Sequence, residues 1–202
     1  MARAFAEIAF TNSVKAAQTR YGSRDSYRRF ELGEKQQDTL SENETAFLAE
    51  RDSFYMASVG ENGWPYVQHR GGPKGFLKVL DESTIGFADF EGNHQYISIG
   101  NLNTDNRVAL FIMDYPNRQR LKIWARARVV HRDEDAKLLA SLSMPDYRAQ
   151  FDRGIILTIE AFDRNCPQHI TPRFSEEEVR QIIAPLMEEN HELKAKLAQI
   201  KG

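Results

Sequence analysis

The chain has 202 residues, which fits one domain with appendages, and 41% of them are hydrophobic, enough for a buried core. Its formal net charge of -2 argues against a broad nucleic-acid surface, which needs a strong basic excess. No apolar run approaches the roughly 18 residues of a membrane span, and the single cysteine excludes an internal disulfide framework. The start, MARAFAEIAF, lacks the long apolar core of a signal peptide. We therefore expect a cytoplasmic protein that binds neither nucleic acid nor membrane.

The first forty residues predict an N-terminal helical extension. Residues 11–29 are polar and compatible with helix, and Gly22-Ser23 predicts a break within them. Residues 41–51 carry a capping box, with Ser41 at the cap and Glu44 three positions later, which predicts a short helix. We assign 1–40 to the extension and 41–174 to the main domain.

The middle of the chain consists of short runs rich in aromatic and β-branched residues, separated by turns that contain Asn, Asp, Gly or Pro. This pattern predicts antiparallel strands, at residues 54–59, 65–70, 76–80, 84–90, 107–115, 119–131 and 154–164. Segments 93–103 and 134–142 are predicted as short helices. Few helices and many antiparallel strands favour a small closed barrel. The predicted fold class is mainly β (α+β): a six- to seven-stranded antiparallel barrel with flanking short helices and a C-terminal helix.

The predicted strand 119–131 shows the clearest alternation. One face is apolar and should point into the core, with Leu121, Ile123, Ala125, Ala127 and Val129. The other face carries Lys122, Trp124, Arg126 and Arg128. Two interpretations remain open for the tryptophan on this polar face: it stacks on a flavin, or its edge packs under the C-terminal tail.

The tail, 175–202, predicts a C-terminal helix. Its residues Ser175 and Glu178 form a second capping box, and Pro185 should kink or restart the helix. Beyond the proline, an apolar stripe follows 4-3-4-3 spacing, with an asparagine at an a-like position: Leu186, Asn190, Leu193, Leu197 and Ile200. An asparagine at such a position fixes register in parallel dimers. The stripe covers about two heptads, so an amphipathic helix that docks on its own barrel is an equal alternative.

Two segments have the composition of an anion site. In Arg70-Gly71-Gly72, the glycines allow backbone amides close to a ligand, and the arginine offers a fork that matches phosphate oxygens. The alternative is a plain hairpin loop. In residues 86–102, polar side chains gather at a predicted helix start, where free amides favour an anion: Asn93, Gln95, Tyr96 and Ser98. The alternative there is an ordinary cap at Asn93.

The order of four segments resembles that of the flavin-binding split barrels related to pyridoxamine 5'-phosphate oxidase. The segments are PYVQHR, GFLKVLDESTIGFADF, GNHQYISIGNLNTDNRVALFI and RQRLKIWARARVV. The HRGGP loop, GNHQYISIGNL and NCPQHI are similar to an oxidase-related branch of that family. The resemblance covers residues 42–173 and implies an FMN-binding split barrel, a homodimer, and a cofactor at the dimer interface.

The resemblance also implies which residues contact FMN. Arg70 would bind the phosphate, and Arg120 would place a cation near the ring. In the family, a Ser-Arg-Lys segment binds the phosphate; the matching positions here are Tyr96, Ile97 and Ser98, so two cations are missing. The phosphate would therefore be bound mainly by Arg70, backbone amides and Ser98. The full set of implied cofactor-binding residues is His69, Arg70, Gly71, Gly72, Lys78, Ala88, Asp89, Phe90, Asn93, Gln95, Tyr96, Ser98, Arg120, Gln168, His169 and Arg173.

From this resemblance we expect the protein to be an FMN-dependent oxidoreductase that acts on an unidentified small molecule. We assign no side chain as catalytic. A non-catalytic module that binds flavin, haem or a similar cofactor, and a deazaflavin-dependent reductase, remain alternatives. The oxidase's substrate-gripping Arg-Leu-His is not recognisable, so we expect no oxidation of pyridoxamine phosphate. The histidines show no metal-ligand spacing, and no metal site is predicted. Cys166 is interpreted as a packed small hydrophobe rather than a redox thiol.

Overall fold

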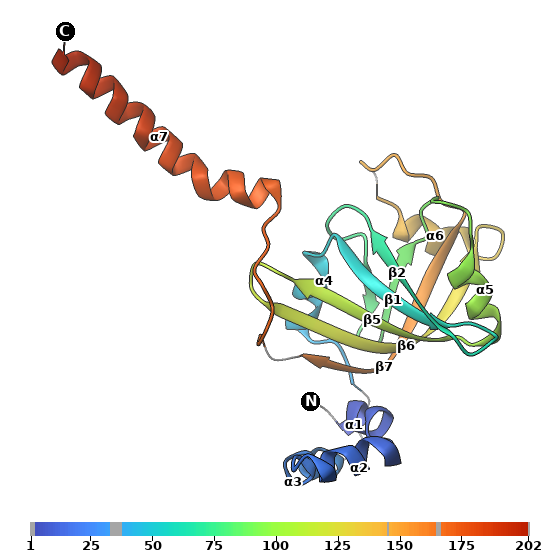
Figure 1. The fold of residues 1–202 in the computed structure, drawn as a ribbon. Coiled ribbons are helices and arrows are strands. Elements are labelled where there is room, and N and C mark those ends of the chain that lie inside the picture. Colours follow the sequence, from blue (N-terminus) through green and yellow to red (C-terminus); the bar gives the residue numbers. More distant parts are fainter. Residues whose placement is uncertain (1–2, 33–37, 145, 165–166, 202) are drawn as a thin grey trace. The chain divides into compact units, whose positions relative to one another are not determined.

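The computed structural model describes residues 3–32, 38–144, 146–164 and 167–201 (Figure 1). The chain divides into two compact units, one of residues 1–113 and 120–166 and one of residues 114–119 and 167–202. Among the described residues, no helix has both the length and the apolar content that crossing a membrane requires. Cys166 lies outside the described residues.

Seven strands form one sheet in the order β2-β1-β5-β6-β7-β4-β3 (Figure 1). The strands are β1 (Ser53–Val59), β2 (Pro65–Gly71), β3 (Lys78–Asp81), β4 (Thr84–Ala88), β5 (Arg107–Asp114), β6 (Gln119–His131) and β7 (Arg153–Arg164). Antiparallel pairing joins β1 to β2 and β5, β4 to β3 and β7, and β6 to β7. The predicted antiparallel split barrel is confirmed. One predicted boundary was wrong: β3 begins at Lys78 because Phe76 and Leu77 turn into the core, where both are buried.

The sheet closes around one apolar core. On β1, Phe54 and Met56 are buried while Tyr55 between them is exposed, as strand alternation requires. The ring of Phe54 lies 5.7 Å from that of Phe76 and 5.2 Å from that of Phe87 on β4. Because β1 and β4 stand near opposite ends of the strand order, this contact requires the sheet to curl back on itself.

Two short helices lie beside the barrel, α5 (Ile97–Thr104) and α6 (Ala136–Leu142). The alternation predicted for β6 holds through Ala127 but then changes face, because Val130 rather than Val129 is completely buried. Val130 packs in a second cluster with Leu139 and Leu142 of α6. Gly154 permits this packing, since an added Cβ would lie 2.5 Å from Leu142 Cδ1.

The N-terminal extension is helical, as predicted. It contains α1 (Arg3–Ala9), α2 (Asn12–Arg20), α3 (Arg24–Arg28) and a 3-10 turn at Arg29–Glu31, and the break falls at Gly22-Ser23. Phe5 of α1 stacks on Trp124 of β6 with ring centroids 4.8 Å apart. The ring of Trp124 thus packs against the N-terminal extension, a contact that neither interpretation named. The helix predicted at the start of the main domain is α4 (Glu42–Ala49), with the Ser41–Glu44 capping box present.

The second unit contains the long helix α7 (Glu176–Lys201) (Figure 1). Its predicted capping box is confirmed: Ser175 N–H donates to Glu178 Oε2 at 2.7 Å, and Glu178 N–H donates to Ser175 Oγ at 3.2 Å. The helix does not restart at Pro185, because the proline lies inside one continuous helix; a kink at this residue stays a prediction.

Candidate cofactor site

A buried carboxylate between two arginines forms the centre of the site. Asp89 is only 5% exposed; its Oδ1 lies 2.5 Å from Arg70 Nη1 and its Oδ2 lies 2.6 Å from Arg153 Nε. The side chains of Arg70 and Arg153 are 12% and 20% exposed. Burial by itself lowers the pKa of Arg153, but hydrogen bonding and charge attraction to Asp89 and Tyr96 together outweigh burial and raise this pKa above its usual value. The trio therefore carries one net positive charge.

Strand pairing and alternation bring the trio together. Along β2, Val67 and His69 are exposed while Gln68 and Arg70 are half-buried on the opposite face. Asp89 follows the end of β4, and Arg153 opens β7, the antiparallel neighbour of β4. The Asp89 N–H donates to the Arg153 carbonyl at 3.0 Å. Arg70 and Asp89 were predicted as cofactor residues, whereas sequence reasoning missed Arg153.

His69 lies away from the trio, although it precedes Arg70 in the chain. Its ring stands 5.6 Å from that of Tyr55 on the outer face of β1 and β2. Consecutive strand residues point to opposite faces of a sheet. His69 and Arg70, which were predicted together, therefore lie on opposite faces. The assignment of His69 to the cofactor stays a prediction.

The glycine pair has a structural role in this loop. Gly71 is part of β2 and pairs with Ser53, and the Gly72 N–H donates to the Asp52 carbonyl at 2.9 Å. A Cβ on Gly72 would lie 2.8 Å from Phe76 Cγ and 3.0 Å from a ring carbon of Phe90. The glycine therefore permits close aromatic packing. Since its amide is already bonded, the expected free amide at this position is not observed.

The start of α5 forms the second wall of the site. Tyr96 is the cap residue of α5, and both Tyr96 and His94 adopt the left-handed conformation, with φ of 53° and 57°. Such residues cost on the order of 1–3 kcal/mol each and cluster at functional sites. The His94 Nδ1 and the Tyr96 hydroxyl are hydrogen-bonded at 2.8 Å, and the guanidinium carbon of Arg153 lies 4.9 Å from the Tyr96 ring centroid. Buried Ser98 donates to Gln68 Oε1 at 2.7 Å.

The helix begins later than the sequence predicted. The segment 93–103 was expected to be helical from its first residue, but α5 starts at Ile97. Asn93 is not the helix cap; its Oδ1 instead accepts the Gln95 N–H at 3.2 Å in a local turn. Asparagine side chains compete with helix for backbone amides in this way.

These elements enclose a polar cavity of about 50 Å³. It is lined by Gln68, Arg70, Asp89, Phe90, Glu91, Gly92, Asn93, His94, Tyr96, Ser98, Ile99 and Arg153. Six predicted cofactor residues thus share one cavity: Arg70, Asp89, Phe90, Asn93, Tyr96 and Ser98. The buried Nε of Arg70 has no hydrogen-bond partner within the described parts of the chain.

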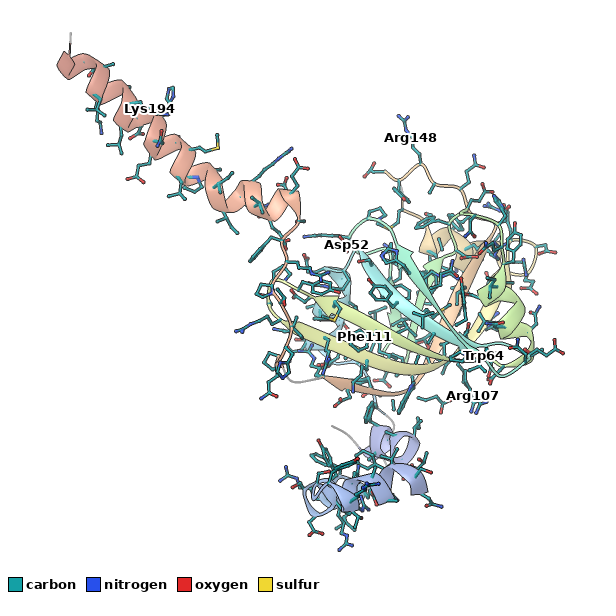
Figure 2. The ribbon with its side chains drawn as sticks, in the orientation of Figure 1. Asp52, Trp64, Arg107, Phe111, Arg148 and Lys194 are labelled. Atoms are coloured by element: carbon teal, nitrogen blue, oxygen red, sulfur yellow. The ribbon has the colours of Figure 1, made fainter. Side chains whose placement is uncertain are left out.

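Other predicted residues lie outside this cavity. Lys78 pairs with Gly86 in the β3–β4 ladder, and the Ala88 side chain packs in the cluster under α6. Arg120 on β6 has its guanidinium carbon 5.7 Å from the ring centroid of Phe111, which Figure 2 labels on β5. The Arg120 Nε is also buried without a hydrogen-bond partner among the residues described. Phe111 lines a separate apolar groove of about 260 Å³ on the outside of β1, β5 and β6.

The C-terminal candidates belong to the second unit. Gln168 is exposed, His169 adopts a left-handed φ of 62°, and the guanidinium carbon of Arg173 lies 5.0 Å from the Tyr115 ring centroid. Their role at the cofactor stays a prediction. No group of three or more His, Cys, Asp or Glu side chains suited to a metal ion occurs in the described part of the chain.

The sequence pattern of the pyridoxamine 5'-phosphate oxidase family matches residues 40–164, more than half of the chain. The chain belongs to the pyridoxamine 5'-phosphate oxidase family. The match begins just before α4 and ends with β7, so it contains the sheet and every residue that lines the cavity. It confirms the family that the sequence resemblance implied. No curated protein matches the chain.

Three solved structures are similar to this member of the pyridoxamine 5'-phosphate oxidase family. HupZ from Group A Streptococcus is 12% identical with a TM-score of 0.50, over 67% of this chain and 100% of that chain. A proposed pyridoxamine 5'-phosphate oxidase from Lactobacillus delbrueckii is 25% identical with a TM-score of 0.48, over 62% and 94%. An FMN-binding protein from Syntrophomonas wolfei is 11% identical with a TM-score of 0.46, over 59% and 81%.

Arg153, Gln68 and His94 line the cavity but were not predicted as site residues. For Gln68 a signal was present, because it shares a strand face with Arg70 two positions later. His94 lies within the polar segment that was singled out. Arg153 offered no local signal, since its place depends on the pairing of β7 with β4.

Proposed function

We propose that the chain binds FMN and acts as a flavin-dependent oxidoreductase on a small molecule. The observation that carries the proposal is the buried Arg70 Nε, which has no hydrogen-bond partner in the described structure although Arg70 lines a polar cavity. A buried unpaired donor is costly unless a ligand or water satisfies it. In a member of the pyridoxamine 5'-phosphate oxidase family, the FMN phosphate is a ligand that suits this cavity.

The residues present fit a phosphate group. Arg70 and Arg153 offer planar donors that match phosphate oxygens, and Ser98 adds a hydroxyl. The first turn of α5 adds backbone amides and the positive end of the helix dipole. Asp89 bonds both guanidinium groups and fixes them beside the cavity, while its negative charge competes with that of the phosphate.

The flavin ring must lie outside this cavity. Ligand pockets for molecules of that size measure about 300–1,000 Å³, whereas the cavity measures about 50 Å³. When bound, FMN supplies the redox chemistry, and the protein supplies orientation and electrostatics. Arg120 is the residue that we expect to contact the flavin ring, because its buried Nε is a second donor without a hydrogen-bond partner among the described residues. A cation beside the ring favours the negative charge that reduction brings.

A homodimer completes this proposal. Tyr55, Trp64 and Val67 are exposed on β1, β2 and the turn between them. Beside them lie the groove of about 260 Å³ and an apolar groove of about 460 Å³. Large contiguous apolar surface marks an interaction site, and two-fold pairing of one such face with its copy is the commonest solution. The ring of FMN would then be covered by the second copy.

The visible spectrum of the purified protein tests the proposal. We expect the absorption bands of oxidised flavin, and mass analysis of the molecule that heat releases should give FMN. Light scattering on the same sample should give twice the mass of one chain. A protein that neither retains FMN nor binds added FMN would refute the proposal; release of a deazaflavin would refute the FMN assignment, and a flavin-loaded monomer would refute the shared site.

Pyridoxamine phosphate should not reduce the bound flavin, although dithionite should. The substrate motif of the oxidases is not recognisable in the sequence, so nothing is expected to hold the donor carbon over the ring. Fixing two reactants in the correct orientation can lower the activation free energy of their reaction by on the order of 7–11 kcal/mol. The measurement is anaerobic mixing while the flavin band is monitored. Loss of the band within seconds would show that the chain oxidises pyridoxamine phosphate through a differently built pocket.

A further inference from the structure

The apolar stripe of α7 is longer than its sequence suggested. Because the helix continues through Pro185, the stripe extends backwards to Val179 and Ile183. Its members then follow 4-3-4-3-4-3 spacing over about three heptads: Val179, Ile183, Leu186, Asn190, Leu193, Leu197 and Ile200. Sustained spacing of this kind over three or more heptads indicates a coiled coil. Pro185 falls between Ile183 (position a) and Leu186 (position d), at position c, which faces away from the seam.

The stripe is exposed. Between Val179 and Leu197, the relative exposure of its large apolar side chains ranges from 39% at Ile183 to 62% at Leu186. Two flanking residues, Ile182 and Met187, are 57% and 65% exposed and widen the apolar surface. Helices in proteins are stabilised mainly by packing of such a face rather than by propensity, and an interior proline opposes helix by about 3 kcal/mol in an unsupported helix. We therefore expect the exposed apolar face of α7 to pack against another apolar surface.

Charge and polarity around the stripe fit a second copy of the same helix. With Asn190 at position a, Glu189 is at position g and Lys194 at position e, and these positions meet across a parallel pair. Ile182 and Met187 form the preceding g–e pair and are both apolar. The sequence has lysine at the next g and e positions, 196 and 201, and these like charges add no attraction at the C-terminal end of the stripe.

Asn190 selects the parallel orientation. In a parallel pair, position a faces its own copy, so two asparagine amides can hydrogen-bond each other. In an antiparallel pair, a faces d, and each amide would oppose a leucine such as Leu186 or Leu193. We propose that α7 forms a parallel two-stranded coiled coil with the α7 of a second chain. This association is independent of the cofactor cavity.

Cysteine cross-linking of the full-length chain tests this association. In a Cys166→Ser background, Ile183→Cys and Leu197→Cys are made separately at position a, and Ala195→Cys at position f serves as the matched control. Facing a positions bring Cα atoms within disulfide range, whereas f positions point apart, so we expect disulfide dimers to form at least about tenfold faster at 183 and at 197 than at 195. Circular dichroism checks that each variant keeps its helix.

The outcomes distinguish the possible pairings. Equal rates at all three positions would refute the coiled coil. Disulfide formation only when Ile183→Cys is mixed with a d-position variant, Leu193→Cys or Ile200→Cys, would show antiparallel pairing and refute the parallel form. Glu189→Lys should slow cross-linking at 183, and the added change Lys194→Glu should restore it, because the g–e attraction returns with opposite signs. Failure of that rescue would refute the proposed register.

Discussion

Asp89→Asn is expected to destabilise the ligand-free protein by about 3 kcal/mol, because removal of one member of a buried ion pair leaves the partner charge uncompensated. Asp89 bonds both Arg70 and Arg153, and all three side chains are largely buried. The asparagine keeps the shape of the carboxylate, so the change reports charge rather than packing. The measurement is the free energy of unfolding by urea without flavin.

The same variant tests whether the two arginines form an anion site. With the competing carboxylate removed, FMN and inorganic phosphate should stabilise Asp89→Asn more than they stabilise the original chain. Glu160→Gln is the control, because Glu160 pairs with Arg126 on the exposed surface at 2.8 Å and should contribute less than about 1 kcal/mol. If phosphate and FMN stabilise the Asp89 variant no more than the original chain, the trio is a structural ion pair and not a phosphate site.

Arg70→Ala should weaken FMN binding about 10- to 100-fold, because a charge-assisted hydrogen bond is worth roughly 1.5–3 kcal/mol. Riboflavin lacks the phosphate, so its affinity should change much less. Arg153→Ala should show the same selectivity, since its guanidinium group lies on the other oxygen of Asp89. Affinities are measured by fluorescence quenching of each ligand on titration with protein.

Two further variants separate charge from structure. Arg70→Lys keeps the charge but not the planar fork, so its FMN affinity should fall between those of the original chain and Arg70→Ala. Arg126→Ala removes an exposed arginine of β6 and should leave both affinities unchanged. Equal losses of FMN and riboflavin affinity in Arg70→Ala would mean that Arg70 acts only through the fold.

Much of the fold followed from the sequence because its signals are local. Strand alternation and turn residues located seven strands, and the capping boxes at Ser41 and Ser175 located two helix starts. Each signal depends on residues within a few positions of one another, so its physical cause is present in the sequence itself. The polar segments around Arg70 and Ser98 were identified for the same reason: their composition is local.

The tertiary structure decided which of those residues meet. Arg153 reaches Asp89 only because β7 pairs with β4, a contact between segments 64 residues apart. It also decided that Val130 rather than Val129 is buried, because α6 covers that end of β6. The local rule for proline predicted a kink or a restart at Pro185, and the helix continues through this residue without a restart. Local patterns determine which elements form and which faces are apolar, whereas packing between distant segments determines the contacts of each face.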